Sequence, residues 1–144
     1  MRLHKLMFVL LFIIAGCSSN LSREEWDVVE EGMSIQSIEE ELGAPTSKLI
    51  EQREILDEIN SVINKDDDML TNPAIAFALN SSPEVVELLA LNKEDLEYLH
   101  RKATNNEDVK IYQYKIESEN DDLLYNVYFH KDKVFHYNGM YVEE

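Results

Sequence analysis

The chain has 144 residues, of which 13 are Lys or Arg and 29 are Asp or Glu, so its formal net charge is −16. This length is enough for one domain with a modest core. The acidic balance argues against a nucleic-acid partner, because phosphate binding needs clustered basic side chains. It also disfavours electrostatic attraction to anionic lipid headgroups.

The N-terminus has the pattern of a signal peptide. "MRLHK" carries Arg2 and Lys5, and the apolar run "LMFVLLFIIAG" follows directly. This run is too short to cross a bilayer as a mature helix. We therefore expect residues 1–16 to be removed, which leaves the chain's single cysteine, Cys17, at the new N-terminus.

The end of this run, "IAGC", resembles the lipobox of bacterial lipoprotein signal peptides. The resemblance implies cleavage before Cys17 and a diacylglyceryl thioether on its sulfur; an ordinary secretory peptide is the alternative. Two or more acyl chains give stable anchoring. Removing Arg2 and Lys5 from the 13 basic residues leaves 11 against 29 acidic ones, a net charge of −18. Residues 17–25 would form a lipidated tether, and Ser18 favours the outer membrane if the host is diderm.

The segment "VVEEGMSIQSIEEELGAP", residues 28–45, predicts a short amphipathic helix. Ser34 is a good N-cap, and Ile35, Ile38 and Leu42 fall on one helical face. Gly43 lies where a left-handed C-cap is expected, and the proline two residues later cannot continue the helix.

The middle of the chain, residues 46–106, reads as helical. A helix is expected over Thr46–Asn64, with an apolar stripe that we interpret as core, a binding groove being the alternative; its members are Leu49, Ile50, Ile55, Leu56, Ile59, Val62 and Ile63. "KDDD", Lys65–Asp68, is expected to be a solvated linker. Asn72-Pro73 and Ser82-Pro83 each predict an N-cap followed by proline at the first helical position. A further short helix is expected to begin with Asn92 as its cap and Asp95 three residues on.

The C-terminal third predicts three antiparallel strands in a meander: "VKIYQYKIES", "LLYNVYFH" and "KVFHYNGMYV". In the second strand, the face of Leu123, Tyr125, Val127 and Phe129 is the expected core face. The last hairpin has two registers. A three-residue "KDK" loop would place His130 and His136 on one face and Phe135 and Tyr137 with Phe129 and Val127, whereas a two-residue loop would separate the histidines. We favour the three-residue loop, and Gly139 is a candidate bulge.

Residues 28–45, with hydrophobic-x-x-Gly-Met-Ser, Ile38 and Leu42-Gly43-x-Pro45, resemble the SmpA/OmlA lipoprotein family. Its best-known member is the small lipoprotein subunit of the outer-membrane β-barrel assembly machinery, and the same segment occurs in the β-lactamase-inhibitor-like fold group. The resemblance extends more loosely over 109–142. It implies helices packed on an antiparallel sheet, with 46–106 as a helical insertion that departs from the family pattern.

The sequence shows no phosphate loop and no nucleophile motif, and an acylated Cys17 would leave no thiol for a disulfide or metal. His100, near a predicted helix end, is expected to be an exposed polar position. His130 and His136 would need a third ligand to hold a metal. The six tyrosines of the predicted strands are sheet formers, and an outward-facing subset favours protein contact; they are Tyr112, Tyr114, Tyr125, Tyr128, Tyr137 and Tyr141.

Taken together, these patterns predict an α+β fold in which N-terminal helices pack on a C-terminal three-stranded antiparallel meander, as a single domain over 26–144. We expect a non-enzymatic lipoprotein without a cofactor, anchored at Cys17 on the extracytoplasmic side of a cell-envelope membrane. It would act by protein–protein contact, as an accessory of an envelope assembly. The alternative is an inhibitor or immunity-type lipoprotein, whose acidity would steer it to a basic enzyme.

Overall fold

The computed structural model describes residues 26–73, 75, 83–116 and 123–141, so the predicted signal peptide and the predicted tether lie outside the described part. Its named elements, in chain order, are α2 (Ile35–Leu42), β1 (Ser47–Leu49), α3 (Gln52–Thr71), α5 (Pro83–Thr104), β2 (Val109–Ile116), β3 (Leu123–His130) and β4 (Lys133–Tyr141). The four strands form one antiparallel sheet in the order β1-β2-β3-β4. The α+β class is confirmed, with four strands in place of the three expected.

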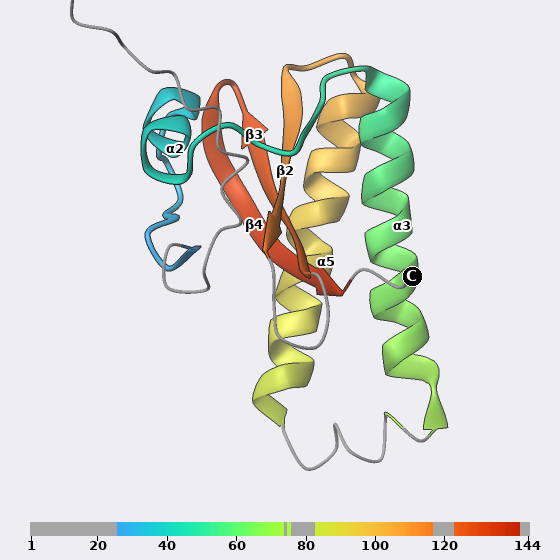
Figure 1. Ribbon diagram of the computed structural model, residues 1–144. Coiled ribbons are helices and arrows are strands. Elements are labelled where there is room, and N and C mark those ends of the chain that lie inside the picture. Colours follow the sequence, from blue (N-terminus) through green and yellow to red (C-terminus); the bar gives the residue numbers. More distant parts are fainter. Residues whose placement is uncertain (1–25, 74, 76–82, 117–122, 142–144) are drawn as a thin grey trace, which may run out of the picture.

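The helices lie on both faces of the sheet. In Figure 1, α2 lies on one side of the strands, and α3 and α5 lie side by side on the other. The two long helices run antiparallel, since Gln52 contacts Ala103 at one end of the pair and Asp66 contacts Asn92 toward the other. The sheet is therefore a shared wall between two cores.

The predicted cap positions of α2 are confirmed, although Gly43, with φ 77° and ψ −163°, does not adopt the expected left-handed helical conformation. The Ser34 hydroxyl oxygen accepts a hydrogen bond from the backbone N–H of Ser37 at 3.1 Å, and the Gly43 N–H donates to the carbonyl of Glu39 at 3.0 Å. Gly43 has φ 77°, a backbone angle that glycine adopts without steric cost. The helix thus has a defined beginning and end.

These caps let α2 cross one face of the sheet from edge to edge. Before the helix, the N–H of Gly32 donates to the Val134 carbonyl of β4, and the Val134 N–H donates to Met33, both at 2.8 Å. After it, the N–H of Thr46 donates to Gln113 of β2 at 2.8 Å. The capped ends of α2 therefore set where the chain joins β4 before the helix and β2 after it.

The expected helix start at Thr46 is wrong. Ser47–Leu49 forms β1, which pairs with β2 through Ser47↔Gln113 and Leu49↔Ile111. The backbone groups at the outer edge of β2 need partners, and this pairing supplies them. Helical spacing placed Leu49 and Ile50 on a helix stripe, but Leu49 packs from the strand and Ile50 is 60% exposed.

Two further expectations about the middle region are wrong. Lys65–Asp68 is not a linker, because α3 continues through it to Thr71, where Asn72 forms the C-cap. Asn92 is not an N-cap, because it lies inside the single 22-residue helix α5, which begins at Pro83. Packing between α3 and α5 overrides the local cap and linker signals, which are weak compared with tertiary contacts. The segment "AIAFALN" and Ser82 lie almost wholly outside the described residues.

The last hairpin corrects the predicted loop. Its turn has two residues, Lys131 and Asp132, with φ 53° and 59°, as a type I′ turn requires. The register then shifts: Phe129 pairs with Val134, but Tyr128 pairs with His136, so Phe135 is the extra residue of a β-bulge. Gly139 is not at the bulge and pairs with Tyr125.

The bulge has a consequence for the two faces. His130 and His136 share the face covered by α3 and α5, as predicted, although the reason is the bulge and not a longer loop. Phe135 also lies on that face, stacked on Tyr98 at 4.8 Å between ring centroids, and not with Phe129 and Val127 as expected. Tyr137, which pairs with Val127, is placed as predicted.

Two apolar cores result. The α2-side core confirms the predicted strand face and consists of Trp26, Val29, Ile38, Leu42, Tyr112, Tyr114, Val127, Phe129 and Val134. The helix-side core confirms the apolar stripe of α3 as a packing surface and consists of Ile55, Ile59, Val62, Leu96, Leu99, Ala103, Val109, Ile111 and Tyr128. Because helices cover both faces of the sheet, β3 is buried on each side from Asn126 to Phe129.

Candidate functional site

A pocket of about 470 Å³ opens where the ends of α3 and α5 that carry Met69 and Leu91 pass beside β4. The residues that line it come from α3, α5, β4 and the loop before α2; they are Glu31, Val62, Asp66, Met69, Leu89, Leu91, Asn92, Asp95, His136, Tyr137 and Asn138. Its volume lies within the range of about 300–1,000 Å³ that is usual for small-molecule sites.

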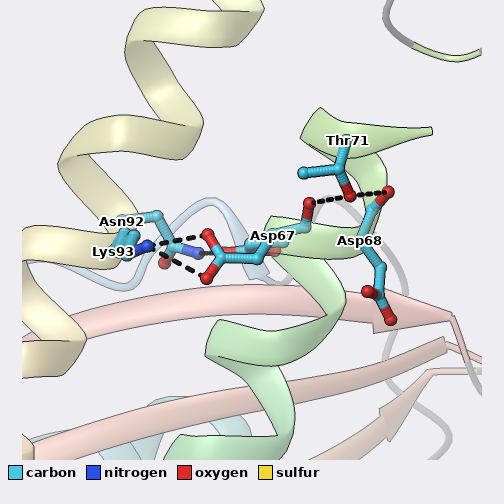
Figure 2. Close-up of polar contacts among 6 residues, drawn as sticks. Asp67, Asp68, Thr71, Asn92 and Lys93 are labelled. Carbon is cyan, nitrogen blue, oxygen red and sulfur yellow. Dashed lines mark hydrogen bonds and ion pairs between the residues drawn. The ribbon is translucent and has the colours of Figure 1, made fainter. Parts of the chain in front are cut away.

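Asn92 of α5 is the centre of a polar network in this pocket. Its amide nitrogen donates to the Asp66 carboxylate of α3, and its amide oxygen accepts from Asn138 Nδ2 at 3.3 Å. His136 Nε2 lies 2.6 Å from the same oxygen. Figure 2 shows Asn92 reaching across to α3 beside the Lys93–Asp67 ion pair, whose atoms are 2.7 and 3.0 Å apart. The network thus joins both long helices to β4.

The orientation of the Asn92 amide determines which nitrogen of His136 carries a hydrogen. Asp66 can only accept, so Asn92 Nδ2 faces it and Asn92 Oδ1 faces the histidine ring, whose Nε2–H must then donate. His136 Nδ1 lies 3.0 Å from the Asp95 carboxylate. A neutral imidazole with its hydrogen on Nε2 has none on Nδ1, so the Asp95 contact is a hydrogen bond only when the ring is charged.

Burial and charge act in opposite directions on His136. Burial lowers the pKa of His136, and this is the larger effect; the carboxylates of Asp95, Glu31 and Asp66 raise it. Burial likewise raises the pKa of Asp66, which is 6% exposed, while the hydrogen bond from Asn92 lowers it. The larger effect favours the neutral ring, in which Nδ1 would have no hydrogen to donate to Asp95.

The pocket lining combines acidic and apolar side chains. Three of the lining residues carry carboxylates, and none of those that the structure identifies is Lys or Arg. Three large apolar side chains on the rim are unusually exposed: Met69 by 38%, Leu91 by 56% and Tyr137 by 38%. We call these three residues the apolar rim. Such an arrangement suits a positively charged group with an apolar stem.

The pocket offers little for covalent chemistry. Among the lining residues that the structure describes there is no Ser, Thr, Cys or Lys that would serve as a nucleophile. Asp95 and His136 form an acid–imidazole pair, but the other ring nitrogen already contacts Asn92. Within the described part of the chain, no three His, Cys, Asp or Glu side chains are placed to hold a metal ion.

The predicted site residues are distributed as follows. Cys17 lies outside the described residues. His136 lies in the pocket, whereas His130 pairs with Glu107 at 3.1 Å and packs on Tyr98 and Phe135. His100, near the end of α5, is partly exposed and is not in the pocket. Among the strand tyrosines, Tyr137 is the one exposed by more than a third in the described part of the sheet, so the predicted outward-facing subset is small.

Sequence reasoning did not find Asp66, Asn92 or Asp95 as site residues. Asp66 had a usable signal, because it follows Ile55, Ile59 and Val62 at helical spacing and so continues the buried stripe. Asn92 and Asp95 had none, since the same two residues fit a capping box equally well.

A second polar network lies under the helices on the same face of the sheet. Asn126 of β3, fully buried, donates to Glu58 of α3 at 2.9 Å and to the Tyr128 hydroxyl at 3.1 Å. Its amide oxygen accepts from Gln113 of β2 at 3.2 Å. This network joins α3 to two strands, but it does not line the pocket.

The fold and site define a small α+β protein: a four-stranded antiparallel sheet with helices on both faces and an acidic pocket beside its last strand. Comparison of the chain with protein-family models, with curated proteins and with solved structures finds no match in any of the three. Of the helices that the structure describes, none is sufficiently long and apolar to span a bilayer.

Proposed function

We propose that this protein is a lipid-anchored lipoprotein of the cell envelope that acts by binding another protein. The lipobox-like "IAGC" and the single cysteine support the anchor. The resemblance of residues 28–45 to the SmpA/OmlA family supports a role as an accessory of an envelope assembly. Anchoring confines the domain near the membrane and so raises its effective concentration for a membrane partner.

The observation that carries protein binding is the apolar rim. Met69, Leu91 and Tyr137 come from α3, α5 and β4, three separate elements, yet they gather around one pocket. Exposed apolar side chains that surround a recess and are backed by polar groups are typical of protein contact surfaces, and tyrosine and methionine are enriched there. An isolated exposed leucine would carry no such weight.

The second candidate, an inhibitor or immunity-type lipoprotein, is favoured by one feature, the net charge of −18 that the mature chain would carry. A strongly acidic domain would associate rapidly with a basic enzyme, and the association rate would fall as salt is added. An accessory protein is expected to depend on its anchor, whereas an inhibitor is expected to bind its target without the anchor.

The test is site-specific photo-crosslinking in living cells with the full chain. A photoreactive amino acid is placed at position 91, on the apolar rim, or at position 50 as a matched control, because Ile50 is 60% exposed but precedes the opposite end of α3. We expect one discrete crosslinked protein from position 91, none from position 50, and loss of the crosslink in Cys17→Ala. Equal crosslinking from both positions would contradict the proposal.

The anchor is tested separately by mass spectrometry of the N-terminal peptide. We expect the mass of a diacylglyceryl group on Cys17 and recovery of the protein in the membrane fraction. An unmodified, freely secreted chain would contradict the anchored part of the proposal while leaving the apolar rim to be judged by crosslinking.

A further inference from the structure

We propose that the acidic pocket binds a basic side chain, arginine in preference to lysine, presented by the protein partner. This inference rests on the proposed function, and it adds the chemistry of the group that the pocket recognises. It depends on three features of the pocket: acceptors that lack donors, walls that suit an alkyl stem, and a rim from which a protein segment can reach inside.

The acceptors come from three elements. Asp95 lies 3.0 Å from His136 Nδ1, which carries no hydrogen in the neutral ring whose Nε2–H bonds Asn92, and its side chain, which lines the pocket, is 38% exposed. Glu31 makes no hydrogen bond or ion pair within the described part of the chain. Asn138 Oδ1, on the β4 side, is buried and likewise without a hydrogen-bond partner among the described residues. A site rich in acceptors and poor in donors is complementary to a group that only donates.

Arginine matches this pattern more fully than lysine. Its guanidinium carries five N–H donors in a planar fork, which can contact carboxylates from two directions and stack on an aromatic face. Asp95 on α5 and Glu31 before α2 supply carboxylates from two elements, and Tyr137, which is 38% exposed, is a third lining residue with an aromatic ring. Lysine presents a compact, strongly hydrated charge that uses the ring less well.

The pocket walls favour an alkyl stem. Val62 and Leu89 contribute further apolar surface to the lining, so the methylene groups of an arginine side chain would replace water there. A bare inorganic cation would gain nothing from these walls, and a purely apolar ligand would leave the carboxylates desolvated. Charge complementarity with the acidic domain would also steer a basic segment toward the pocket.

The test uses purified full-length lipoprotein in nonionic detergent, with binding followed by NMR of the His136 ring. The probes are acetyl-Leu-Arg-Leu-amide and the same peptide with citrulline, the neutral isostere of arginine. We expect the arginine peptide to bind at least about tenfold more tightly than the citrulline peptide, with an affinity that falls as salt is added. Equal affinity for the two peptides would overturn the proposal.

Variants locate the site. Asp95→Asn and Glu31→Gln are each expected to weaken the arginine peptide several-fold, whereas Glu94→Gln, an exposed α5 residue outside the pocket, is the matched control and should leave affinity unchanged. Glu31 is exposed and has no hydrogen bond or ion pair within the described residues, so its variant remains informative if Asp95→Asn folds poorly. If Glu31→Gln and Glu94→Gln reduced the affinity for the arginine peptide equally, the effect would be one of overall charge, and the pocket would not be the binding site.

A second arm distinguishes a partner's side chain from a free small cation. Butylguanidinium is titrated beside the peptide, and we expect it to bind more weakly, because it cannot contact the apolar rim through a peptide backbone and leucine side chains. Tighter binding of butylguanidinium than of the peptide would overturn the assignment to a protein. If neither probe binds but position 91 still crosslinks, this inference fails and the proposed function stands. If the peptide binds but position 91 does not crosslink in cells, the pocket's preference for arginine stands and the proposed function fails.

Discussion

The two faces of the sheet are built on different principles. The face under α2 packs aromatic and aliphatic side chains around Trp26, whose ring lies 4.4 Å from Tyr125 and 6.2 Å from Tyr114 between centroids. The face under α3 and α5 has an apolar centre as well, but Asn126, Asp66 and Gln113 are buried with it, and His136 lies at its margin.

The difference shows where specificity and function are concentrated. An apolar core tolerates exchange of one hydrophobic side chain for another of similar volume. Buried polar groups tolerate little, because a donor or acceptor that loses its partner costs its full desolvation penalty. The polar face therefore fixes how α3 and α5 lie on the strands, and it places Asn92 and Asp66 in the floor of the pocket.

The largest expected effect tests the apolar face. Phe129→Ala should lower the free energy of unfolding by about 3–5 kcal/mol, because Phe129 is fully buried between Tyr112 and α2 and its loss leaves a cavity. Urea denaturation measures the change. The control is Val28→Ala, at a position 40% exposed, which should change stability by less than about 1 kcal/mol. A small loss in Phe129→Ala would mean that this face is not a close-packed core.

The next effect tests the polar face with a change of nearly equal volume. Asn92→Asp places a second carboxylate against Asp66 in place of an amide donor, and should cost about 2–3 kcal/mol at pH 7. Asp66→Asn is the matched variant: it keeps an oxygen acceptor for Asn92 and removes a buried charge, so it should be near neutral or stabilising.

The Asn92→Asp variant also has a predicted pH dependence. Burial already raises the pKa of Asp66, and a second carboxylate beside it should raise it further. The penalty should therefore shrink as the pH falls toward 4 and one of the two acids takes up a proton. A penalty independent of pH would indicate that the two side chains do not share the site.

A smaller effect is expected from one buried tyrosine on each face of the sheet. Each should change the free energy of unfolding by about 1.4 kcal/mol per pH unit at alkaline pH. Burial raises the pKa of both Tyr114, on the α2 side, and Tyr128, on the helix side, well above 10. The folded state then holds protons that the unfolded state loses above pH 10, so stability should fall as the pH rises beyond that value. Circular dichroism of urea unfolding between pH 8 and 11 measures the slope.

Replacing each tyrosine singly with phenylalanine shows how much each face contributes to the loss of stability at alkaline pH. Tyr114→Phe loses only a 3.4 Å hydrogen bond to the Gly43 carbonyl, whereas Tyr128→Phe removes an acceptor from buried Asn126. Each should reduce the alkaline slope by a similar amount, but Tyr128→Phe should cost more stability at pH 7. Equal stability losses would remove the proposed contrast between the faces.

The smallest effect belongs to His136. Because burial lowers its pKa below 6.5, the unfolded chain binds this proton more readily, and stability should fall as the pH drops from about 6.5 toward the folded-state pKa. Asp95→Asn removes a group that raises this pKa and should move the NMR titration of the ring to lower pH. A His100→Gln control should leave it unchanged. An upward shift in Asp95→Asn would contradict the assigned contact.

Much of the fold was readable because local chemistry specified it. Ser34 and Gly43 bound α2 as expected, and the alternation of Tyr125, Val127 and Phe129 identified a core face of β3. Each of these signals acts through the residue's own backbone or its immediate neighbours. Interpretation failed where a distant segment decided the outcome, as for Ser47–Leu49, whose strand depends on the edge of β2 sixty residues away in sequence.

The pocket was the least readable feature for the same reason. His136 shares a face with His130 only because Phe135 forms a bulge, and a bulge is not specified by alternation of hydrophobic residues. Asp66 is buried only because α3 continues through an acidic run that would be solvated in isolation. Asn92 reaches it only because α5 passes alongside at that level.

By itself, the sequence determined the α+β class, the caps of α2, the strands of the C-terminal third and the apolar stripe of α3, because caps, turns and periodicity act over a few residues. Tertiary structure alone decided that both faces of the sheet are covered, that three carboxylates meet a histidine in one pocket, and that Met69, Leu91 and Tyr137 line it. These features depend on contacts between segments far apart in the chain, and no local pattern of residues encodes such contacts.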